Sequence, residues 1–495
     1  MKESKLSVEL SKEIGQINKN LYGNFSEHLG RCIYDGFWVG IDSNIPNYNG
    51  IRKDLVDALK EIHIPVLRWP GGCFADAYHW RDGIGPRDKR PIRYNNHWDC
   101  FETNQFGTHE FFELCELLGS EPYVCGNLGS GTIQEMTEWL EYLTYEKNTT
   151  LAMERKKNGR EKPFNIKYWG IGNENWGCGG SMSAQYYANE YKRYATYVAE
   201  TNPSIYKIAC GANAFDFHWT EKFFSMISGK ACECASKINL VDGYSFHYYT
   251  HFGGSSFDFN QIEWYCTILN TFAMEDLIQE HRKIMDKYDP NRRMGLLCDE
   301  WGTWFQATEK YNKRWLYQEN TMRDAIVAAI NLNIFNQNCD KLVMANLAQT
   351  VNVLQSLALT ENDKMVLTPT YFVFKMYVPH QNAHALRFDL ETPDISRLNL
   401  QQIHASCSRN QDTLFITMAN LSADESASIE ILIPELKDYS IERVNLLSGE
   451  DFKAMNTFDN PDNIKIQELD SKKISLSDFQ IPPASVSSIL CRISN

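Results

Sequence analysis

The chain repeats one unit eight times over most of its length: a short apolar segment, a polar or glycine-containing turn, and an amphipathic stretch. The apolar segments are residues 21–25, 65–69, 122–126, 166–172, 207–211, 243–246, 294–298 and 341–346. In the amphipathic stretches apolar residues recur every three or four positions, as Leu55, Leu59 and Ile62 do, which indicates helices that bury one face. Eight alternating strands and helices predict an α/β fold, a (β/α)8 or TIM barrel.

A doubly wound open sheet is the alternative arrangement of such units. It is disfavoured because no phosphate-binding glycine-rich turn follows any of the apolar segments. The predicted helices cover residues 52–62, 108–118, 132–145, 184–200 and 315–335, and a further helix at 370–377 would complete the barrel.

The pattern changes after residue 380 or so. Short, often alternating apolar runs are separated by Asn, Asp, Ser, Gly and Pro, which is typical of an antiparallel sandwich. These runs are residues 404–408, 413–418, 427–433, 441–446 and 486–492, and the opening stretch 5–17 alternates in the same way. We therefore expect N-terminal strands that join the sandwich (1–18), a catalytic barrel (19–378) and a C-terminal all-β sandwich domain (379–495).

Size and charge narrow the classes of function. A chain of 495 residues is too long for one ordinary core, and its net charge of −14 argues against nucleic acid and acidic membranes as partners, because both need a basic face. The first residues contain no apolar signal segment, and no run of 18 apolar residues occurs. We expect a cytoplasmic protein, although a chain whose signal peptide had been removed would look the same.

The 14 cysteines are scattered through the predicted strands and helices, without a CxxC pair or a Cys/His ligand spacing. Cys232 and Cys234 are the nearest pair, and their spacing is too tight for ordinary zinc-binding geometry. We expect mostly buried, reduced thiols, no metal and no organic cofactor.

Two glutamates mark the ends of predicted strands. Glu174 closes the segment Lys167-Tyr-Trp-Gly-Ile-Gly-Asn-Glu, and Glu300 closes Met294-Gly-Leu-Leu-Cys-Asp-Glu. The C-terminal ends of the strands meet at one mouth of a TIM barrel, so these two carboxylates can face each other. Two facing carboxylates are the working groups of a glycosidase. The neighbouring Asp299 is expected to point to the opposite side of its strand and to be structural.

Further polar residues lie at other strand ends. Arg68 can keep Glu300 ionised through a charge-assisted hydrogen bond, although from the sequence alone it equally fits pairing with a structural acid. Asn173 can bind the sugar hydroxyl next to the reacting carbon. Glu27 follows the first strand and can bind other sugar hydroxyls.

The segment Ser245-Phe-His-Tyr-Tyr249 closes the sixth predicted strand. Tyr248 or Tyr249 can supply a hydroxyl to a catalytic carboxylate. A lone histidine such as His247 is more often a structural hydrogen-bonding residue than a catalyst.

Together these motifs resemble glycoside hydrolase family 51, the α-L-arabinofuranosidases. The resemblance covers nearly the whole chain and rests on a set of motifs in a fixed order. They are Gly23-Asn-Phe-Ser-Glu-His-Leu-Gly-Arg31, Arg68-Trp-Pro-Gly-Gly-Cys-Phe74, Trp80-Arg-Asp-Gly-Ile-Gly-Pro86, Gly172-Asn-Glu174, His247-Tyr-Tyr249 and Asn346-Leu-Ala-Gln-Thr-Val-Asn352. It implies a (β/α)8 barrel with a β-sandwich, a retaining double displacement, and self-association into a homo-oligomer.

The resemblance also assigns roles to matching positions. Glu174 matches the general acid/base and Glu300 the nucleophile. Positions that contact the furanose are matched by Glu27, Cys73, Asn173 and Gln349. Groups that orient the nucleophile are matched by Arg68 and a tyrosine of the His247-Tyr-Tyr249 motif, for which Tyr249 is favoured over Tyr248.

We therefore expect an exo-acting α-L-arabinofuranosidase whose substrate is an arabinose-containing oligo- or polysaccharide such as arabinan or arabinoxylan. One alternative is an endo-β-1,4-glucanase or β-xylosidase on the same barrel. Another is a carbohydrate-binding protein without catalysis, which would have no need for both carboxylates. The loops at 176–182 and 250–260 should form the subsites beyond the scissile bond.

Overall fold

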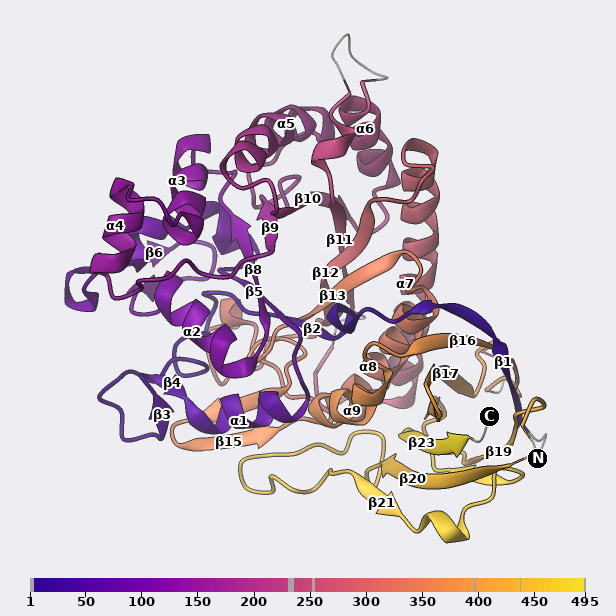
Figure 1. Cartoon of the computed structure of the whole chain (residues 1–495). Coiled ribbons are helices and arrows are strands. Elements are labelled where there is room, and N and C mark those ends of the chain that lie inside the picture. The colour runs from indigo at the N-terminus through magenta and orange to yellow at the C-terminus, as the bar shows by residue number, and fades with distance from the viewer. Residues whose placement is uncertain (1–3, 230–235, 252–253, 396–397, 437, 494–495) are drawn as a thin grey trace.

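The computed structural model describes residues 4–229, 236–251, 254–395, 398–436 and 438–493 (Figure 1). Cys232 and Cys234, and part of the loop at 250–260, lie outside these residues.

A closed barrel of eight parallel strands forms the larger part of the protein. In chain order the strands are β2 (Gly23–Phe25), β5 (Val66–Trp69), β8 (Glu121–Gly126), β9 (Tyr168–Ile171), β10 (Tyr206–Asn213), β11 (Gly243–Thr250), β12 (Gly295–Thr303) and β13 (Leu342–Ala348). Around the barrel their order is β10-β11-β12-β13-β2-β5-β8-β9, so neighbours in sequence are neighbours in space. Each predicted apolar segment supplies one strand, and the predicted TIM barrel is confirmed.

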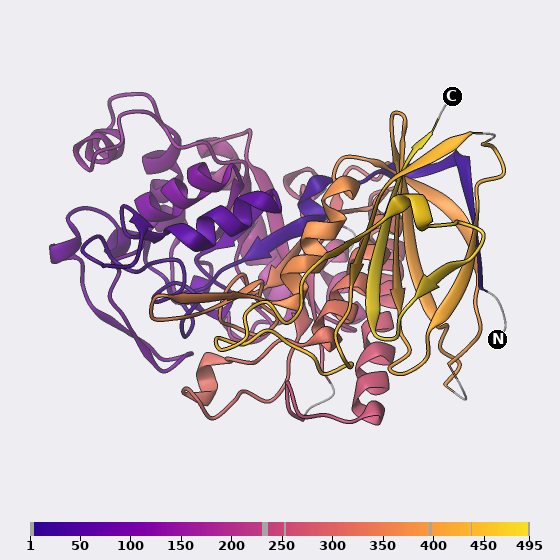
Figure 2. The same cartoon turned by 90° about the horizontal axis from the view of Figure 1, so that it is seen from below.

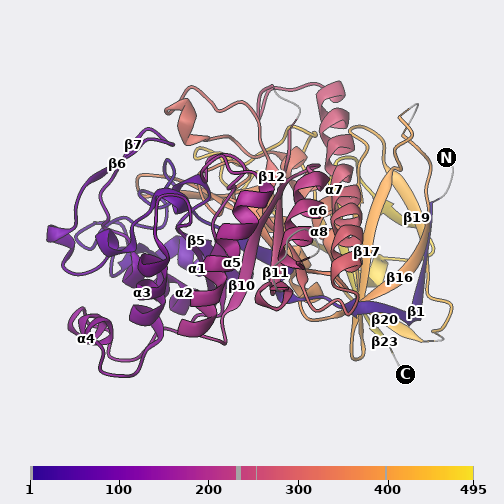
Figure 3. The same cartoon turned by 90° about the horizontal axis from the view of Figure 1, so that it is seen from above.

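Helices cover the outside of the barrel, as Figures 1 and 3 show. They are α1 (Lys53–Glu61), α2 (Thr108–Leu118), α3 (Ile133–Thr144), α4 (Thr150–Lys157), α5 (Ala184–Thr201), α6 (Phe217–Ile227), α7 (Gln261–Tyr288), α8 (Met322–Gln337) and α9 (Pro369–Tyr377). Within the described ranges no helix combines the length and the apolar composition that crossing a membrane requires.

The start of α8 differs from the prediction, which began this helix at residue 315. The helix begins at Met322 because Thr321 caps it: the Thr321 side chain accepts a hydrogen bond from the Arg323 backbone amide, and Asp324 accepts one from the backbone amide of Thr321. This reciprocal pair satisfies two amides that the first helical turn leaves unpaired.

Two separate apolar layers hold the barrel. Inside it, side chains from six strands form a compact plug of Val66, Tyr123, Tyr168, Ile208, Leu297 and Met344. Outside it, the other face of each strand packs against the helices in one large continuous core. Because the plug fills the interior, a ligand can enter only at the strand ends, where the loops lie.

The second domain is a curled, mostly antiparallel sheet of nine strands (Figure 2). The strands are β1 (Ser4–Gln16), β16 (His384–Glu391), β17 (Ile403–Asn410), β18 (Thr413–Asn420), β19 (Ala427–Leu432), β20 (Tyr439–Leu447), β21 (Gln467–Leu469), β22 (Phe479–Ile481) and β23 (Ser485–Ile493). The N-terminal β1 lies between β16, which is antiparallel to it, and β19, which is parallel. The predicted all-β domain is thus confirmed, while the boundaries at residues 18 and 378 stay a prediction.

Three two-stranded hairpins complete the structure. They are formed by β3 (Asn47–Tyr48) with β4 (Ile51–Arg52), β6 (Arg93–Asn95) with β7 (Cys100–Glu102), and β14 (Ala358–Glu361) with β15 (Lys364–Leu367). The β6–β7 hairpin matters for the site, because the turn between its strands carries Trp98.

Candidate active site

A bulge in β12 places the first of the two glutamates. Phe246 of β11 pairs with Cys298, but the next residue, His247, pairs with Glu300, so β12 contains one extra residue at this point. As a result Leu297 lies in the plug inside the barrel, whereas Trp301, four residues on, packs against helix residues outside it. A regular strand would send both to the same side.

The same bulge corrects the expectation for Asp299. It does not point away from Glu300: the Nε atom of Arg68 lies 4.0 Å from Asp299 Oδ2, and the Nη1 atom of Arg68 lies 2.9 Å from Glu300 Oε1. Asp299 also accepts hydrogen bonds from the hydroxyl of Tyr123 (2.6 Å) and the amide of Asn346 (3.2 Å). Both carboxylates therefore reach the barrel interior, where Asp299 forms an ion pair with Arg68.

Glu300 is buried and is surrounded by a cationic group and hydrogen-bond donors. Arg68 donates to one carboxylate oxygen, and the hydroxyl of Tyr249 donates to the other at 2.6 Å. The Nδ1 atom of His247 is 3.6 Å from Glu300 Oε2. Burial acts to raise the pKa of Glu300, but His247, Arg68 and Tyr249 more than offset this, so the pKa lies below the ordinary glutamate value.

The two adjacent tyrosines have different partners. Tyr249 contacts Glu300, whereas the hydroxyl of Tyr248 donates to the backbone oxygen of Asn270 at 2.5 Å. Of the two, Tyr249 is thus the one in contact with a carboxylate of the predicted catalytic pair.

Glu174 lies on the loop that follows β9. Its backbone is in the left-handed region (φ 42°), which a non-glycine residue adopts only when its surroundings enforce it. Asp76 is part of that constraint: its Oδ2 accepts hydrogen bonds from the Asn173 amide (2.9 Å) and the Asn175 side chain (3.0 Å). Burial raises the pKa of Asp76 to about 6. No sequence motif pointed to Asp76, because its partners are about 100 residues away.

His247 joins the two glutamates. Its Nδ1 atom is 2.8 Å from Glu174 Oε1, and a carboxylate oxygen from Glu174 and one from Glu300 lie within 4.8 Å of each other. Burial acts to lower the pKa of His247, but Glu300 and Glu174 raise it above the ordinary histidine value. The sequence favoured a purely structural role for His247, and only the fold reveals that it contacts both carboxylates.

The residues expected to contact a furanose lie around this pair. Glu27 accepts hydrogen bonds from the Phe74 amide (2.9 Å), Trp98 Nε1 (2.9 Å) and Gln349 Nε2 (3.1 Å). Burial raises the pKa of Glu27 to about 7, with a smaller contribution from Glu300. No specific role was predicted for Trp98.

Two buried polar atoms indicate where a ligand could bind. The side-chain Oδ1 atom of Asn173 accepts a hydrogen bond from Arg68 at 2.5 Å, but its Nδ2 atom has no hydrogen-bond partner among the described residues. The Oε1 atom of Gln349 is likewise buried and unpartnered within the described part of the chain. Since buried polar atoms are almost always paired, this donor and this acceptor are suited to sugar hydroxyls.

Cys73 is bonded to another cysteine. It forms a disulfide with Cys178, across the two loops that follow β5 and β9. The Sγ atoms of Cys73 and Cys178 lie 3.9 Å and 3.4 Å from Glu174 Oε2. The other cysteines in the described ranges are free thiols, most of them buried, as expected.

A pocket of about 570 Å³ opens next to the carboxylates. It is lined by Glu174, Trp176, Asn213, Ala214, Phe215, His247, Tyr248, Tyr249, His251 and Trp304. Phe215 and Trp304 are partly exposed, so their rings offer apolar faces on which a sugar or aryl group can stack.

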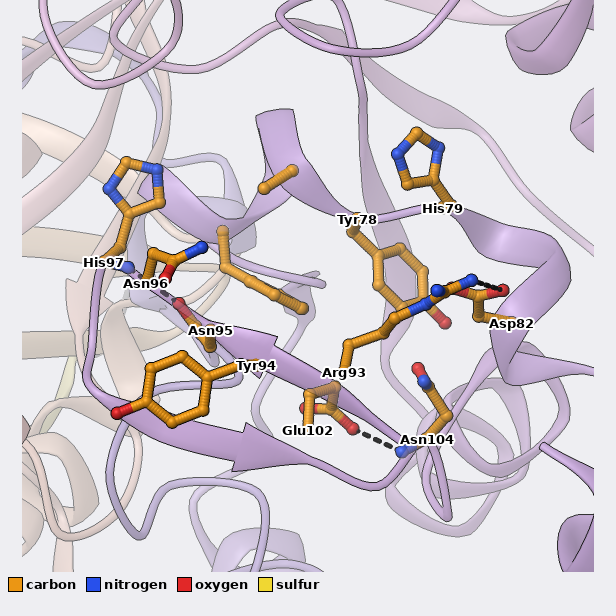
Figure 4. Close-up of a pocket in the computed structure, with 12 residues that line it drawn as sticks. Tyr78, His79, Asp82, Arg93, Tyr94, Asn95, Asn96, His97, Glu102 and Asn104 are labelled. Atoms are coloured by element: carbon orange, nitrogen blue, oxygen red, sulfur yellow. Dashed lines mark hydrogen bonds and ion pairs between the residues drawn. The ribbon is translucent and has the colours of Figure 1, made fainter. Parts of the chain in front are cut away.

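A second pocket, of about 260 Å³, lies beside the β6–β7 hairpin (Figure 4). Arg93 forms an ion pair with Asp82 there, and Glu102 accepts a hydrogen bond from the Asn104 amide. Neither Glu174 nor Glu300 lines this pocket. These contacts instead anchor the hairpin whose turn brings Trp98 to Glu27.

Comparison with known proteins finds two matching family models. Residues 58–251 match the model of the alpha-L-arabinofuranosidase 1 domain, and residues 299–485 match that of the alpha-L-arabinofuranosidase C-terminal domain. An intracellular exo-alpha-L-arabinofuranosidase of Bacteroides ovatus is 44% identical over 485 residues, which are 96% of this chain and 92% of that protein.

Two solved structures are also similar over nearly the full chain. The GH51 arabinofuranosidase from Xanthomonas axonopodis pv. citri superposes with a TM-score of 0.93 at 40% identity, covering 99% of this chain and 100% of that one. An alpha-L-arabinofuranosidase from Thermotoga maritima, solved as an arabinose complex, has a TM-score of 0.86 at 31% identity, with 99% of each chain covered.

Proposed function

The chain belongs to glycoside hydrolase family 51, the α-L-arabinofuranosidases, and on that premise we propose that Glu300 and Glu174 carry out a retaining double displacement on terminal arabinofuranosyl groups. The enzyme is an exo-acting glycoside hydrolase, and its substrates are arabinose-containing glycans. The observation that carries the mechanism is the distance below 4.8 Å between oxygens of the two carboxylates. Retaining enzymes hold their carboxyl groups about 5–5.5 Å apart, whereas inverting enzymes leave room for a water between them.

In the first step Glu300 attacks the anomeric carbon. Arg68 and Tyr249 each donate a hydrogen bond to it, and its lowered pKa keeps it ionised at neutral pH. Glu174 protonates the departing oxygen at the same time. An arabinosyl ester of Glu300 and a free leaving group result.

In the second step Glu174 removes a proton from water, which attacks the anomeric carbon. The bond between that carbon and the Glu300 oxygen breaks, so that arabinose, the Glu300 carboxylate and protonated Glu174 result. His247 lies within hydrogen-bonding distance of Glu174 and close to Glu300. It therefore helps to balance the negative charge of Glu174 after this residue gives up its proton in the first step. No metal or organic cofactor is needed for this chemistry.

Recognition of the furanose is assigned to groups around the nucleophile. We assign the unpartnered Asn173 Nδ2 and Gln349 Oε1 to two sugar hydroxyls, and Glu27 and Cys73 to the remaining edge of the ring. The pocket of about 570 Å³ on the Glu174 side receives the leaving group. Arabinan, arabinoxylan and their oligosaccharides all present arabinosyl branches of suitable size.

Two further properties follow from relatives rather than from the site. The Bacteroides ovatus relative is named intracellular, which supports a cytoplasmic location for this enzyme. The family resemblance supports a homo-oligomer. Sedimentation velocity tests the latter, and a monomer at all concentrations would contradict it.

Hydrolysis of 4-nitrophenyl α-L-arabinofuranoside, compared with the β-D-xyloside and β-D-glucoside, tests the proposed activity. We expect a clear preference for the arabinofuranoside that is lost in Glu300→Ala. Activity on a β-glucan instead would favour the endoglucanase alternative. No turnover of any glycoside would favour a carbohydrate-binding protein.

A further inference from the structure

The disulfide beside the general acid/base brings together three groups of kinds that can bind Zn²⁺, two cysteine sulfurs and a carboxylate. The ligand atoms of Cys73, Cys178 and Glu174 all lie within 4.8 Å of one another. The Cα atoms of the two cysteines are 5.4 Å apart, so the backbone holds both sulfurs at one point whether or not they are bonded. All three side chains are half-buried, which leaves them accessible from the mouth of the barrel.

We propose that reduction of the Cys73–Cys178 bond opens a binding site for a soft divalent cation such as Zn²⁺, formed by the two cysteine sulfurs and the Glu174 carboxylate. Reduction by a phosphine and water adds two electrons and two protons to the bond and gives two thiols and a phosphine oxide. The cation then displaces one proton from each thiol and binds the two thiolates. Two Cys and one carboxylate leave a fourth position for water, which suits tetrahedral Zn²⁺.

The positions of the charged groups favour this corner of the pocket over the other one: His247 contacts Oε1 of Glu174, whereas both sulfurs lie beside Oε2. Glu174, His247 and Glu300 also lie within 4.8 Å of one another, but the Arg68 guanidinium is 2.9 Å from Glu300 and repels a cation there. Next to Cys178 and Cys73 the described structure provides sulfur and carboxylate, and thiolate sulfur is the ligand that Zn²⁺ and Cd²⁺ prefer to oxygen.

A cation at this site would stop hydrolysis. Glu174 cannot protonate a leaving group while its carboxylate is bound to a metal. Cys73 lies where the furanose is expected to bind, so the cation and the substrate compete. In the oxidised enzyme both cysteines are in the disulfide, so the cation should not inhibit it. The disulfide thus protects the enzyme from inhibition by the cation.

Cd²⁺ titration of the full-length enzyme, reduced with a phosphine and desalted without oxygen, tests the proposal. We expect a cadmium–thiolate charge-transfer band that saturates at one cation per chain, and a parallel loss of arabinofuranosidase activity that a chelator reverses. The oxidised enzyme should show neither. Cys178→Ser should weaken Cd²⁺ binding at least about tenfold, and inhibition of each variant is measured against its own metal-free rate.

Cys266→Ser is the matched control, because Cys266 is a half-buried free thiol on α7, outside the cluster. It should bind Cd²⁺ as the wild type does. Equal binding by oxidised and reduced enzyme, unchanged inhibition in Cys178→Ser, or Cd²⁺ binding without loss of activity would each overturn the proposal. The band is read without substrate, so a failure of the proposed arabinofuranosidase function would not remove it.

Discussion

The two sides of the active site are built differently. On one side Glu300 lies within the continuous strand β12, only 7% of its side chain is exposed, and Arg68 and Tyr249 donate to its two oxygens. On the other side Glu174 lies on a loop with a left-handed backbone, 17% of its side chain is exposed, and it faces the larger pocket.

The difference matches what each carboxylate must do. A nucleophile must stay ionised and in one position, so donors from the barrel strands β5 and β11 suit Glu300. A general acid/base must exchange a proton with the leaving group and then with water, so it needs a more open position on the side where both arrive. Substitutions on the two sides should therefore give distinguishable losses of activity.

Replacement of the nucleophile should have the largest effect. Glu300→Ala leaves no group to form the arabinosyl intermediate, so kcat should fall by about 10⁴-fold or more for every substrate. Steady-state hydrolysis of aryl arabinofuranosides with good and poor leaving groups measures this. A variant that kept substantial turnover on either kind, with unchanged thermal stability, would contradict the role of Glu300.

The loss in Glu174→Ala should depend on the leaving group. For a sugar leaving group, which needs protonation, the rate of the first step should fall by about 10²–10⁴-fold. For a dinitrophenyl leaving group, which departs without a proton, the first step should be nearly unaffected and only the second slow. Burst kinetics separate the two steps, and an equal loss for both leaving groups would exclude Glu174 as the acid.

The adjacent tyrosines provide a matched pair on the nucleophile side. Tyr249→Phe removes one hydrogen bond to the charged Glu300, which is worth about 1.5–3 kcal/mol and so about 10- to 100-fold in kcat/KM. Tyr248→Phe removes a bond to the backbone of Asn270 and should change kcat/KM much less. Equal losses of activity in the two variants would contradict the contact between Tyr249 and the nucleophile.

The smallest effect is expected on the pH profile of a His247→Asn variant. His247 is among the groups that lower the pKa of Glu300, so its removal should raise that pKa. Since Glu300 must be ionised to attack, the acidic limb of kcat/KM should move to higher pH. A limb that stayed in place or moved to lower pH would show that His247 does not stabilise the ionised nucleophile.

The eight barrel strands were predictable because each is a short apolar run with its own turn signal. The exact end of a strand was less so: β12 runs on to Thr303, three residues past Glu300. The bulge at Asp299 could not be predicted from the sequence of β12 alone. A bulge depends on how a strand pairs with its neighbours, here β11 and β13.

Glu174 and Arg68 were named as candidates from the sequence because they lie in recognisable motifs. Asp76, Trp98 and Cys178 were not, because each acts through a partner far along the chain. Asp76 constrains the loop of Glu174, and Trp98 reaches Glu27 from a hairpin 71 residues away. Such contacts exist only once the barrel has brought its loops to one end.

Peptide mapping of the arabinosyl–enzyme shows which residue is the nucleophile. Glu174→Ala is mixed with a dinitrophenyl α-L-arabinofuranoside, quenched in acid within the burst, digested and analysed by mass spectrometry. Because the variant lacks the base for the second step, we predict that the intermediate accumulates as an arabinosyl ester on the peptide that contains Glu300. A burst of dinitrophenol without this adduct, or with the sugar on another residue, would contradict the assignment of the two carboxylates.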